Sequence, residues 1–242
     1  MHSKNETVTI GWCDNGMADG KFMEGLAFTM LQNPGLIIGS VRAQGNQIAR
    51  QRQTLLDEWY KLNNTDWLLW IDSDIVLTPE VFQMLWDTAD KVSKPIVTGT
   101  YFISKESEQS MMAAFPCLFT DTDDEWNLKY VHPLPENQVI KIDAAGMGLV
   151  LMHRTVVTKL REEFPDESVF AEILFPDRFV GEDIAFFRHV KQAGIPAYAH
   201  TGATVKHMKR FALDENYYHN FWQIQMLIAQ QRKKDDRVSK LV

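Results

Sequence analysis

The sequence is poor in cysteine, with only Cys13 and Cys117 among 242 residues. The two positions do not show the close pairing of a zinc site. A disulfide between them is one interpretation. We favour two buried free thiols in a reducing compartment, because cytoplasmic proteins keep their cysteines reduced.

Long apolar runs are also missing. The N-terminal residues MHSKNETVT are polar and lack the apolar stretch of a secretory signal. The best apolar segment, residues 67–77, contains two aspartates and falls short of the roughly 20 residues that span a bilayer. We therefore expect a protein that works in the cytoplasm without a membrane anchor.

An excess of positive charge is absent, since 25 Lys and Arg stand against 32 Asp and Glu. Proteins that bind nucleic acid regardless of sequence usually carry a basic surface, so the net charge of -7 weakens that function without excluding a local basic patch. Repeats and Gly/Ser-rich linkers are missing too. The length suits one large domain, alone or with a short extension.

The first hundred residues alternate β-prone and helical patterns. Strands are predicted at 8–12, 36–41, 67–71 and 95–102, and helices at 22–31, at 47–62 and from Thr78-Pro79-Glu80 onward. This alternation predicts an α/β fold with a mainly parallel sheet. Ligands bind beyond the carboxyl ends of such strands, which places four side chains on one rim: Asp14, Asn15, Asp72 and Asp74.

The second half has less regular patterns. Residues 104–137 show few periodic segments, and we interpret them as a mobile or acceptor-facing region. A strand is predicted over 140–152, where Gly146 and Gly148 indicate a bulge or a close approach of backbone to ligand. A helix at 183–192, a strand at 197–205, a helix at 217–228 and a frayed charged tail from Arg232 complete the chain.

The motif Asp72-Ser73-Asp74 carries the clearest functional signal. A bare Asp-x-Asp is common, and Asp121-Thr122-Asp123 provides a second copy in what we expect to be a solvated loop. The first copy differs because it follows an apolar run, 67–71, that suits a buried central strand. Two carboxylates at such a strand end are costly without a compensating cation, and Mg²⁺ or Mn²⁺ favours their oxygens. The alternative is two acids that cap turns.

Two further elements gain weight only in combination. Glu182 and Asp183 begin a helix, where acids complement the helix dipole or, alternatively, one acts as a general base. His207 lies just past a strand and His200 within it, and imidazole is a frequent ligand of Mn²⁺-like ions. A histidine at a strand end is more often simply hydrogen-bonded.

Arginines near the same rim suit phosphate or a base edge. Arg42 ends the second predicted strand, and Arg50 begins the helix after it. A solvated helix face with charge pairs is an equally good interpretation for Arg50.

In their order, these elements resemble the GT-A superfamily of glycosyltransferases, especially the small family-2-like enzymes of bacteria and phages. The similarity runs from about residue 8 to 208 and is strongest over 67–80, 143–154 and 181–187, followed by the strand that ends at His207. It implies a Rossmann-like three-layer sandwich. It also implies a catalytic domain over 1–210, with a donor half (1–103) and an acceptor half (104–210), before a C-terminal helix and tail (211–242).

The resemblance also implies roles for individual residues. Metal binding would fall to Asp74 and His207, with Asp72 near the metal or the ribose of the donor. Asp183, beside Glu182, would be the base of an inverting mechanism. The donor would contact a larger set: Asp14, Asn15, Arg50, Asp72, Asp143, Gly146 and Gly148. Gln51 departs from the family pattern, which has Asn after the Arg, so the contacts to the donor differ in detail.

The implied activity is metal-dependent transfer of a hexose from a nucleotide sugar, with UDP-sugar and Mn²⁺ (or Mg²⁺) favoured, to a hydroxyl acceptor. The acceptor would be a protein side chain, a glycan precursor or a modified DNA base, and a phage enzyme would act in the host cytoplasm. A nucleotidyltransferase is the alternative, although the 14–21 loop has a single Lys where such enzymes carry a basic, glycine-rich loop. A non-catalytic sugar-nucleotide-binding module is the third hypothesis.

Overall fold

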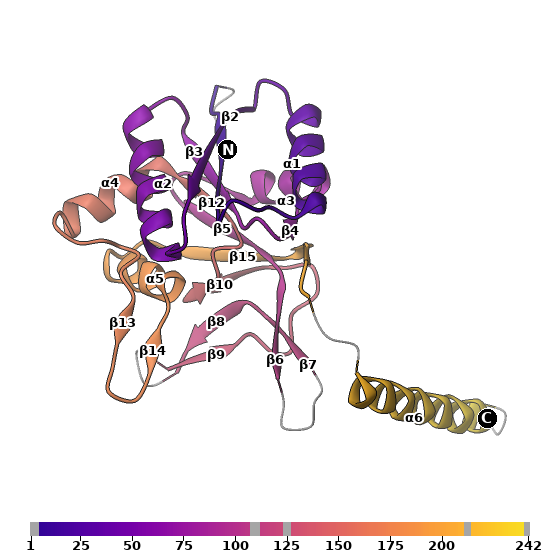
Figure 1. Cartoon of the computed structure of the whole chain (residues 1–242). Helices are drawn as coiled ribbons and strands as arrows, with labels where there is room; N and C mark the ends of the chain where they lie inside the picture. Colours follow the sequence, from indigo (N-terminus) through magenta and orange to yellow (C-terminus); the bar gives the residue numbers. More distant parts are fainter. Residues whose placement is uncertain (1–4, 107–111, 123–126, 211–213, 240–242) are drawn as a thin grey trace. The chain divides into compact units, whose positions relative to one another are not determined.

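The computed structural model describes residues 5–106, 112–122, 127–210 and 214–239 (Figure 1). The chain divides into two compact units. The first comprises residues 1–103 and 116–208, and the second comprises residues 104–115 and 209–242. The first unit holds the central sheet and all candidate site residues.

A seven-stranded sheet forms the middle of the first unit. Its order is β10 (Val139–Ile142), β15 (Ala197–Thr204), β5 (Ile96–Thr100), β12 (Leu149–His153), β3 (Trp67–Ile71), β1 (Val8–Asp14) and β2 (Ile37–Gln44). The pairings β1–β2, β1–β3 and β5–β15 are parallel, whereas β12 and β10 run antiparallel to their neighbours. The sheet is therefore mixed and mostly parallel in strand direction, and the predicted α/β class is confirmed.

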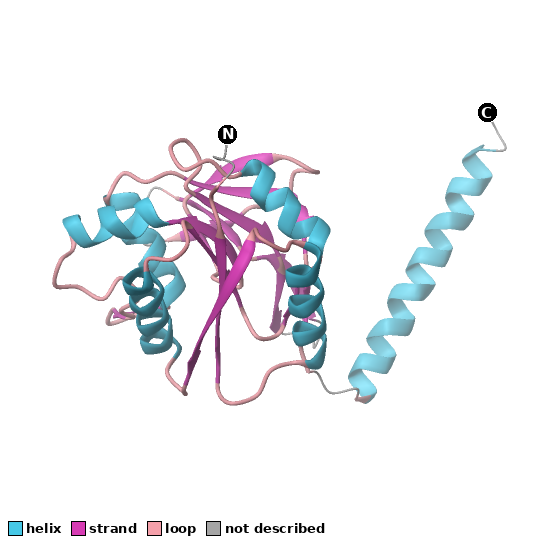
Figure 2. Ribbon diagram, turned by 90° about the horizontal axis from the view of Figure 1, so that it is seen from above, coloured by secondary structure: helices cyan, strands magenta, loops and turns pink. Residues whose placement is uncertain are grey.

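Helices cover both faces of this sheet, as Figure 2 shows. Residues of α2 (Ile48–Leu62), α4 (Arg154–Glu163) and α5 (Glu182–Gln192) pack into one hydrophobic cluster. Residues of α1 (Gly20–Gln32) and α3 (Pro79–Thr88) pack into a second cluster. Every residue of β3 is buried, as its unbroken apolar sequence predicts for a strand covered on both faces. The result is a three-layer α/β/α sandwich.

Short strands complete the structure. Three two-stranded sheets pair β4 (Ile75–Val76) with β16 (Lys206–His207), β6 (Phe102–Glu106) with β7 (Met112–Pro116), and β13 (Ile173–Leu174) with β14 (Phe179–Val180). In a three-stranded sheet, β8 (Leu118–Asp121) lies between β9 (Leu128–Tyr130) and β11 (Ala144–Ala145). The long helix α6 (Glu215–Ser239) lies in the second unit.

The single strand predicted over 140–152 is wrong. The structure divides it into β10, β11 and β12, of which β11 belongs to a different sheet. The break between β11 and β12 contains Gly146 and Gly148, whose backbone packs against the ring of Tyr101. A Cβ at Gly148 would lie 2.8 Å from the ring, closer than real side chains allow.

Three further predictions need correction. Residues 104–137, expected to show little regular structure, contain strands β6 to β9 over their described part. The tail expected to fray continues as α6 to Ser239. Helix α4 was not predicted, because its cap is His153 rather than Ser, Thr, Asp or Asn, and its first turn contains the β-branched Thr155, Val156 and Val157.

The two cysteines are free and buried, as expected. Burial raises the pKa of the Cys13 thiol to about 12 and that of Cys117 to about 11, so neither is a nucleophile near neutral pH. Among the described residues, no helix is both long and apolar enough to cross a membrane.

Candidate active site

The Asp72–Asp74 turn lies at the carboxyl end of β3. Its backbone is fixed by hydrogen bonds from Asp72 N to Gly148 O (3.1 Å) and from Ile75 N to Asp72 O (3.0 Å). The side chains of Asp72 and Asp74 are 31% and 36% exposed, directly after a strand that is wholly buried. The fold therefore displays both carboxylates at the rim of the sheet.

Asp74 and His207 meet across the small β4–β16 sheet, in which His207 pairs with Ile75. His207 Nε2 lies 3.2 Å from Asp74 Oδ2, and Met208 N donates to Asp74 O at 2.8 Å. His207 Nδ1 lies 2.9 Å from the carbonyl oxygen of Phe102. A carbonyl only accepts, so Nδ1 carries a proton and a neutral ring points its Nε2 lone pair at the carboxylate.

This geometry suits a cation. A lone pair and a carboxylate oxygen at 3.2 Å repel each other unless a proton or a metal ion lies between them. The Nδ1–carbonyl bond is the outer contact that commonly orients a metal-bound histidine. Within the described part of the chain, however, no three His, Cys, Asp or Glu side chains form a ready-made metal site. The Asp72–Asp74–His207 triad stays a prediction, and the structure brings together two of its members.

Asp72, the third residue of the predicted metal site, forms an ion pair with Arg52. Arg52 Nη2 lies 3.1 Å from Asp72 Oδ1, and Arg52 Nη1 lies 2.5 Å from Glu182 Oε1. The Arg52 side chain is only 6% exposed. Burial opposes its charge, but Asp72 and Glu182 outweigh burial and hold the pKa of Arg52 above its usual value. One buried guanidinium thus joins the rim of β3 to the start of α5.

Asp183 follows Glu182 in the first turn of α5 and is partly buried. Its Oδ1 accepts a hydrogen bond from Ile184 N at 2.8 Å. Burial, aided by the neighbouring Glu182 charge and opposed by Arg52, raises the pKa of Asp183 to about 6. A carboxyl group with this pKa exchanges protons near neutral pH, as acid–base catalysis requires.

Gly146 and Gly148 lie against Tyr101. A Cβ at Gly146 would come within 1.9 Å of the Tyr101 hydroxyl oxygen and 2.6 Å of Cys117 Sγ. Gly148 N donates to the same hydroxyl at 3.3 Å. The structure thus supplies a packing reason for both glycines, and their predicted contact with a donor stays a prediction.

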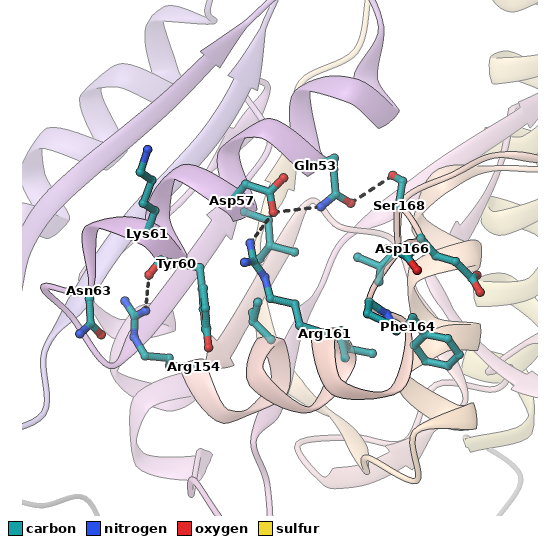
Figure 3. Close-up of a pocket in the computed structure, with 16 residues that line it drawn as sticks. Gln53, Asp57, Tyr60, Lys61, Asn63, Arg154, Arg161, Phe164, Asp166 and Ser168 are labelled. Atoms are coloured by element: carbon teal, nitrogen blue, oxygen red, sulfur yellow. Dashed lines mark hydrogen bonds and ion pairs between the residues drawn. The ribbon is translucent and has the colours of Figure 1, made fainter.

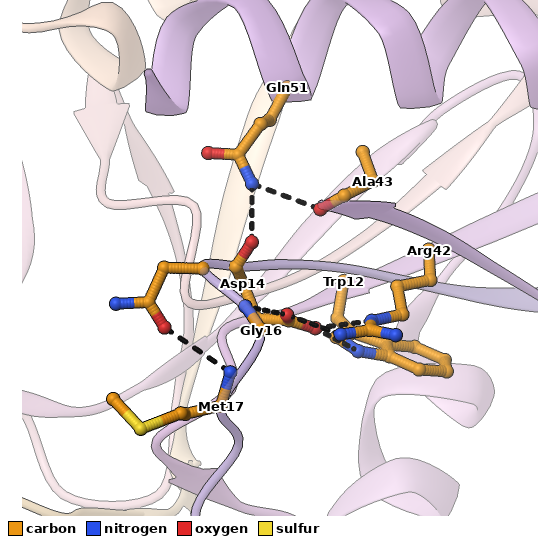
Figure 4. Close-up of polar contacts among 8 residues, drawn as sticks. Trp12, Asp14, Gly16, Met17, Arg42, Ala43 and Gln51 are labelled. Atoms are coloured by element: carbon orange, nitrogen blue, oxygen red, sulfur yellow. Dashed lines mark hydrogen bonds and ion pairs between the residues drawn. The ribbon is translucent and has the colours of Figure 1, made fainter. Parts of the chain in front are cut away.

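Asp14, at the end of β1, has a fully occupied carboxylate (Figure 4). It accepts hydrogen bonds from Arg42 Nε and Nη2, both at 2.6 Å, from Trp12 Nε1 at 3.0 Å and from Gly16 N at 2.7 Å. The Arg42 guanidinium holds the pKa of Asp14 below its usual value. Asp14 therefore shapes this rim through Arg42 and the following turn.

Beside Asp14, a pocket of about 670 Å³ opens between the end of β2 and the start of α2. Its lining includes Arg50, Gln51 and the Gly45–Asn46 turn. Asn15, also on this rim, accepts a hydrogen bond from Met17 N at 3.3 Å and is exposed. The pocket and Asn15 agree with the predicted nucleotide position without testing it.

Asp143 lies in a separate ionic cluster. Its Oδ1 is 3.0 Å from Lys191 Nζ, and its Oδ2 accepts from Asp121 N at 3.0 Å. Asp121 Oδ1 in turn pairs with Arg188 Nη1 at 2.7 Å, and Lys191 also contacts Asp121. Asp121 is thus not in the solvated loop expected for the second Asp-x-Asp. It ends β8 and is 18% exposed, because α5 places two cations against it.

His200 lies on β15, where its Nδ1 accepts a hydrogen bond from Gly202 N at 3.1 Å.

Three contributors to the site were not predicted from sequence: Arg52, Tyr101 and the carbonyl of Phe102. For Arg52 a signal exists, because it shares a helical stripe with Leu55, Leu56 and Trp59, all buried. A charged residue on a buried stripe requires a buried partner.

A cavity of about 1060 Å³ lies between α2 and α4 (Figure 3). Arg154 in its wall donates to the carbonyls of Thr65, Tyr60 and Trp59 at the end of α2, at 2.8 to 3.3 Å. Arg161 pairs with Asp57 at 2.6 Å and lies over the Tyr60 ring. None of the residues discussed above as site candidates lines it, and its polar groups serve the packing of the two helices.

The chain was compared with known proteins by sequence and by structure. No protein-family model and no curated protein matches the sequence. Among solved structures, A197 from STIV superposes with a TM-score of 0.52 at 16% identity, over 84% of this chain and 86% of that one. GalNAc-T7 with UDP, GalNAc and Mn²⁺ superposes with a TM-score of 0.58 at 11% identity, over 87% of this chain and 45% of that one.

A third structure, CMP:2-keto-3-deoxy-manno-octonic acid synthetase complexed with CTP, has a TM-score of only 0.44 at 12% identity, over 93% of this chain and 99% of that one. At 16% and 11% identity, the likenesses to A197 and GalNAc-T7 establish a shared fold and nothing finer. The chain spans less than half of the GalNAc-T7 chain.

Proposed function

We propose that this chain is a metal-dependent glycosyltransferase that moves a hexose from a UDP-sugar to a hydroxyl acceptor. The observation that carries the proposal is the pairing of Asp74 Oδ2 with His207 Nε2 at 3.2 Å, beside Asp72 at the end of β3. It provides a carboxylate and an imidazole for a divalent cation at the edge where α/β folds bind nucleotides. The similar GalNAc-T7 structure contains UDP, GalNAc and Mn²⁺, which supports the same donor and metal class.

The spacing of the strands suits a nucleoside diphosphate. The pocket by β2 and the Asp72–Asp74 turn after β3 are separated by β1, so they lie two strand spacings apart, roughly 10 Å. A base bound in the pocket would place its diphosphate near Asp74. Asp14, Asn15 and Arg50 would border that path, as proposed from the sequence.

Asp74 and His207 would hold the metal, with phosphate oxygens, water or Asp72 completing its ligands. An imidazole ligand favours Mn²⁺ over Mg²⁺. When bound, the ion supplies Lewis-acid stabilisation for the charge that grows on the departing diphosphate. Arg52 keeps Asp72 oriented and neutralises part of the carboxylate charge on this rim.

Asp183 would act as the base. The acceptor hydroxyl oxygen attacks the anomeric carbon, its proton passes to Asp183, and the bond from that carbon to the diphosphate oxygen breaks. With a pKa of about 6, Asp183 is ionised at neutral pH yet basic enough to take the proton. A base with this pKa favours sugar transfer to a hydroxyl over nucleotidyl transfer to a sugar phosphate, whose oxygen is already ionised and needs no base.

The acceptor is proposed by chemical class. A protein side chain, a small glycan precursor and a modified DNA base all offer the hydroxyl that Asp183 requires. The net charge of -7 disfavours a DNA acceptor relative to a protein. Asp143, Gly146 and Gly148 would lie on the sugar and acceptor side of the site.

A donor screen tests the proposal. The purified chain is incubated with a panel of nucleotide sugars, with and without Mn²⁺, and release of the nucleoside diphosphate is measured. We expect release from a UDP-sugar that requires Mn²⁺ and is lost in Asp74→Ala but retained in Asp177→Ala, an exposed aspartate in the turn between β13 and β14. Pyrophosphate release from a nucleoside triphosphate and a sugar phosphate would instead establish a nucleotidyltransferase. Nucleotide binding without turnover would indicate the non-catalytic module.

A further inference from the structure

Gln51 has an amide whose orientation is fixed by the backbone. Its Nε2 donates to the carbonyl oxygens of Asp14, at 2.8 Å, and Ala43, at 3.0 Å. The reversed amide would set Oε1 against two acceptors, so only one orientation is stable. In Figure 4 the oxygen of Gln51 accordingly points away from both carbonyls.

The Gln51 oxygen remains available. Among the described residues, it accepts no hydrogen bond, whereas the side-chain nitrogen makes two. This oxygen is not fully buried, so water or a ligand can reach it. Gln51 is 8% exposed and lines the pocket of about 670 Å³ together with Arg50. The pocket therefore contains an acceptor that cannot turn into a donor.

Gly45 makes room for this arrangement. A Cβ at Gly45 would lie 3.3 Å from Gln51 Cγ, tighter than most side-chain contacts, and 3.5 Å from its Cδ, an ordinary contact distance. The Gln51 side chain therefore packs closely over Gly45, in the turn between β2 and α2. Both the backbone bonds and this close packing hold the acceptor rigid, which is what discrimination between ligands requires.

We propose that Gln51 is the residue that selects the nucleobase of the donor, by accepting the ring N–H of uracil at Oε1. The inference rests on the proposed function, because it assumes a nucleoside diphosphate in this pocket. Uracil presents an N–H at ring position 3, flanked by two carbonyl oxygens. Cytosine presents a lone pair at the same position and would face Oε1 acceptor to acceptor.

Arg50 complements this selection. It lines the same pocket and only donates hydrogen bonds, so it suits a carbonyl oxygen beside the N–H of uracil. Guanine has a ring N–H as well, but its adjacent amino group needs a second acceptor, and a single amide oxygen satisfies one donor. The combination of one fixed acceptor with a neighbouring donor thus matches the ring N–H and carbonyl edge of uracil.

A ligand series tests the inference on the intact protein. Dissociation constants for UDP, CDP, GDP and N3-methyl-UDP are measured by calorimetry in the presence of Mn²⁺. We expect UDP to bind roughly tenfold or more tightly than each of the other three, because each leaves a buried polar group unpaired. Equal affinity for UDP and N3-methyl-UDP would overturn the role of Gln51. Absence of binding by every nucleotide would overturn the proposed function itself.

A matched pair of variants tests whether Gln51 is responsible for the preference for UDP over CDP. Gln51→Met keeps the side-chain length without the amide, and Gln53→Met makes the same change on another face of α2. We expect the preference for UDP over CDP to vanish in Gln51→Met and to persist in Gln53→Met. An unchanged preference in a folded Gln51→Met protein would refute the assignment. If that variant fails to fold, Gln51→Asn, which shortens the reach, and the N3-methyl comparison decide the question.

Discussion

Arg52 Nη1 lies 2.5 Å from Glu182 Oε1, although the two residues are 130 positions apart in the chain. The other end of the guanidinium binds Asp72. Through Arg52, the turn proposed to face the donor diphosphate and the helix that carries the proposed base share one rigid contact. A shift of α5 would therefore disturb both carboxylate groups together.

Removing the Arg52 charge should destabilise the fold. Arg52→Met leaves Asp72 and Glu182 without their cation, and the loss of one partner from a buried ion pair costs about 3 kcal/mol. Urea denaturation measures the change in unfolding free energy. Arg161→Met is the control, because Arg161 and Asp57 are both nearly half exposed and such pairs contribute little. Equal effects of the two substitutions would contradict the structural role of Arg52.

The pH dependence of turnover should report on Asp183. Its pKa of about 6 means that the base gains activity as it loses its proton. We expect kcat/KM to reach half of its plateau near pH 6 and to level off about one pH unit higher, and Asp183→Asn to lower the plateau by roughly 10²- to 10⁴-fold. Rate profiles from pH 4.5 to 8.5 test this, and a profile in Asp183→Asn identical to that of the wild type would remove Asp183 as base.

Asp183 should also affect stability with a defined sign. Its pKa is higher in the folded protein than the ordinary 3.8, so the folded state holds this proton more tightly than the unfolded state. The resulting stabilisation is complete below about pH 4 and is lost as the pH rises through about 6. Asp183→Asn should therefore gain stability relative to the wild type between pH 4 and pH 8. Thermal unfolding across this range checks the sign, with Asp177→Asn as the exposed control.

Mn²⁺ should stabilise the protein through Asp74 and His207. With UDP present, ligand linkage predicts a higher melting temperature when Mn²⁺ is added. Asp74→Asn and His207→Ala should each remove this increase, while Asp177→Asn keeps it. A full Mn²⁺ response in both site variants would place the ion elsewhere.

Gly146 and Tyr101 should be energetically coupled. Gly146→Ala introduces a Cβ that would lie 1.9 Å from the Tyr101 hydroxyl oxygen, and such overpacking typically costs about 1–3 kcal/mol. Tyr101→Phe removes that oxygen, so the double variant should be less destabilised than the sum of the single variants. Strict additivity in a double-mutant cycle would show that the contact is not the reason for the glycine.

Much of this architecture could be predicted from patterns among residues that are close in the sequence. The unbroken apolar run of β3, the Thr78-Pro79 cap of α3 and the alternation of strands with helices all depend on neighbouring residues, and they predicted the α/β class and the rim that holds Asp72 and Asp74. The contact between Asp74 and His207 depends on the pairing of β4 with β16, and only the resemblance to a family brought the two residues together beforehand.

What could not be predicted depends on distant partners. Gly146 and Gly148 pack against the ring of Tyr101, which lies on a distant segment, and Arg52 is tied to Glu182 across the fold. In sequence, Gln51 is a departure from the family pattern, whereas its role depends on two carbonyls at the ends of β1 and β2. Such roles become visible only when the strands are assembled.

The position of β12 has a consequence for how this chain is made. β12 lies between β3 and β5, so residues 149–153 complete the hydrogen bonding of two strands that are entirely buried. A nascent chain that has left the ribosome only as far as residue 103 has both strands but not the strand between them. Its unpaired edges would be open to pairing with other chains. Residues 1–103 and 104–210 are therefore inseparable in synthesis, and a fragment ending at residue 103 should aggregate rather than fold.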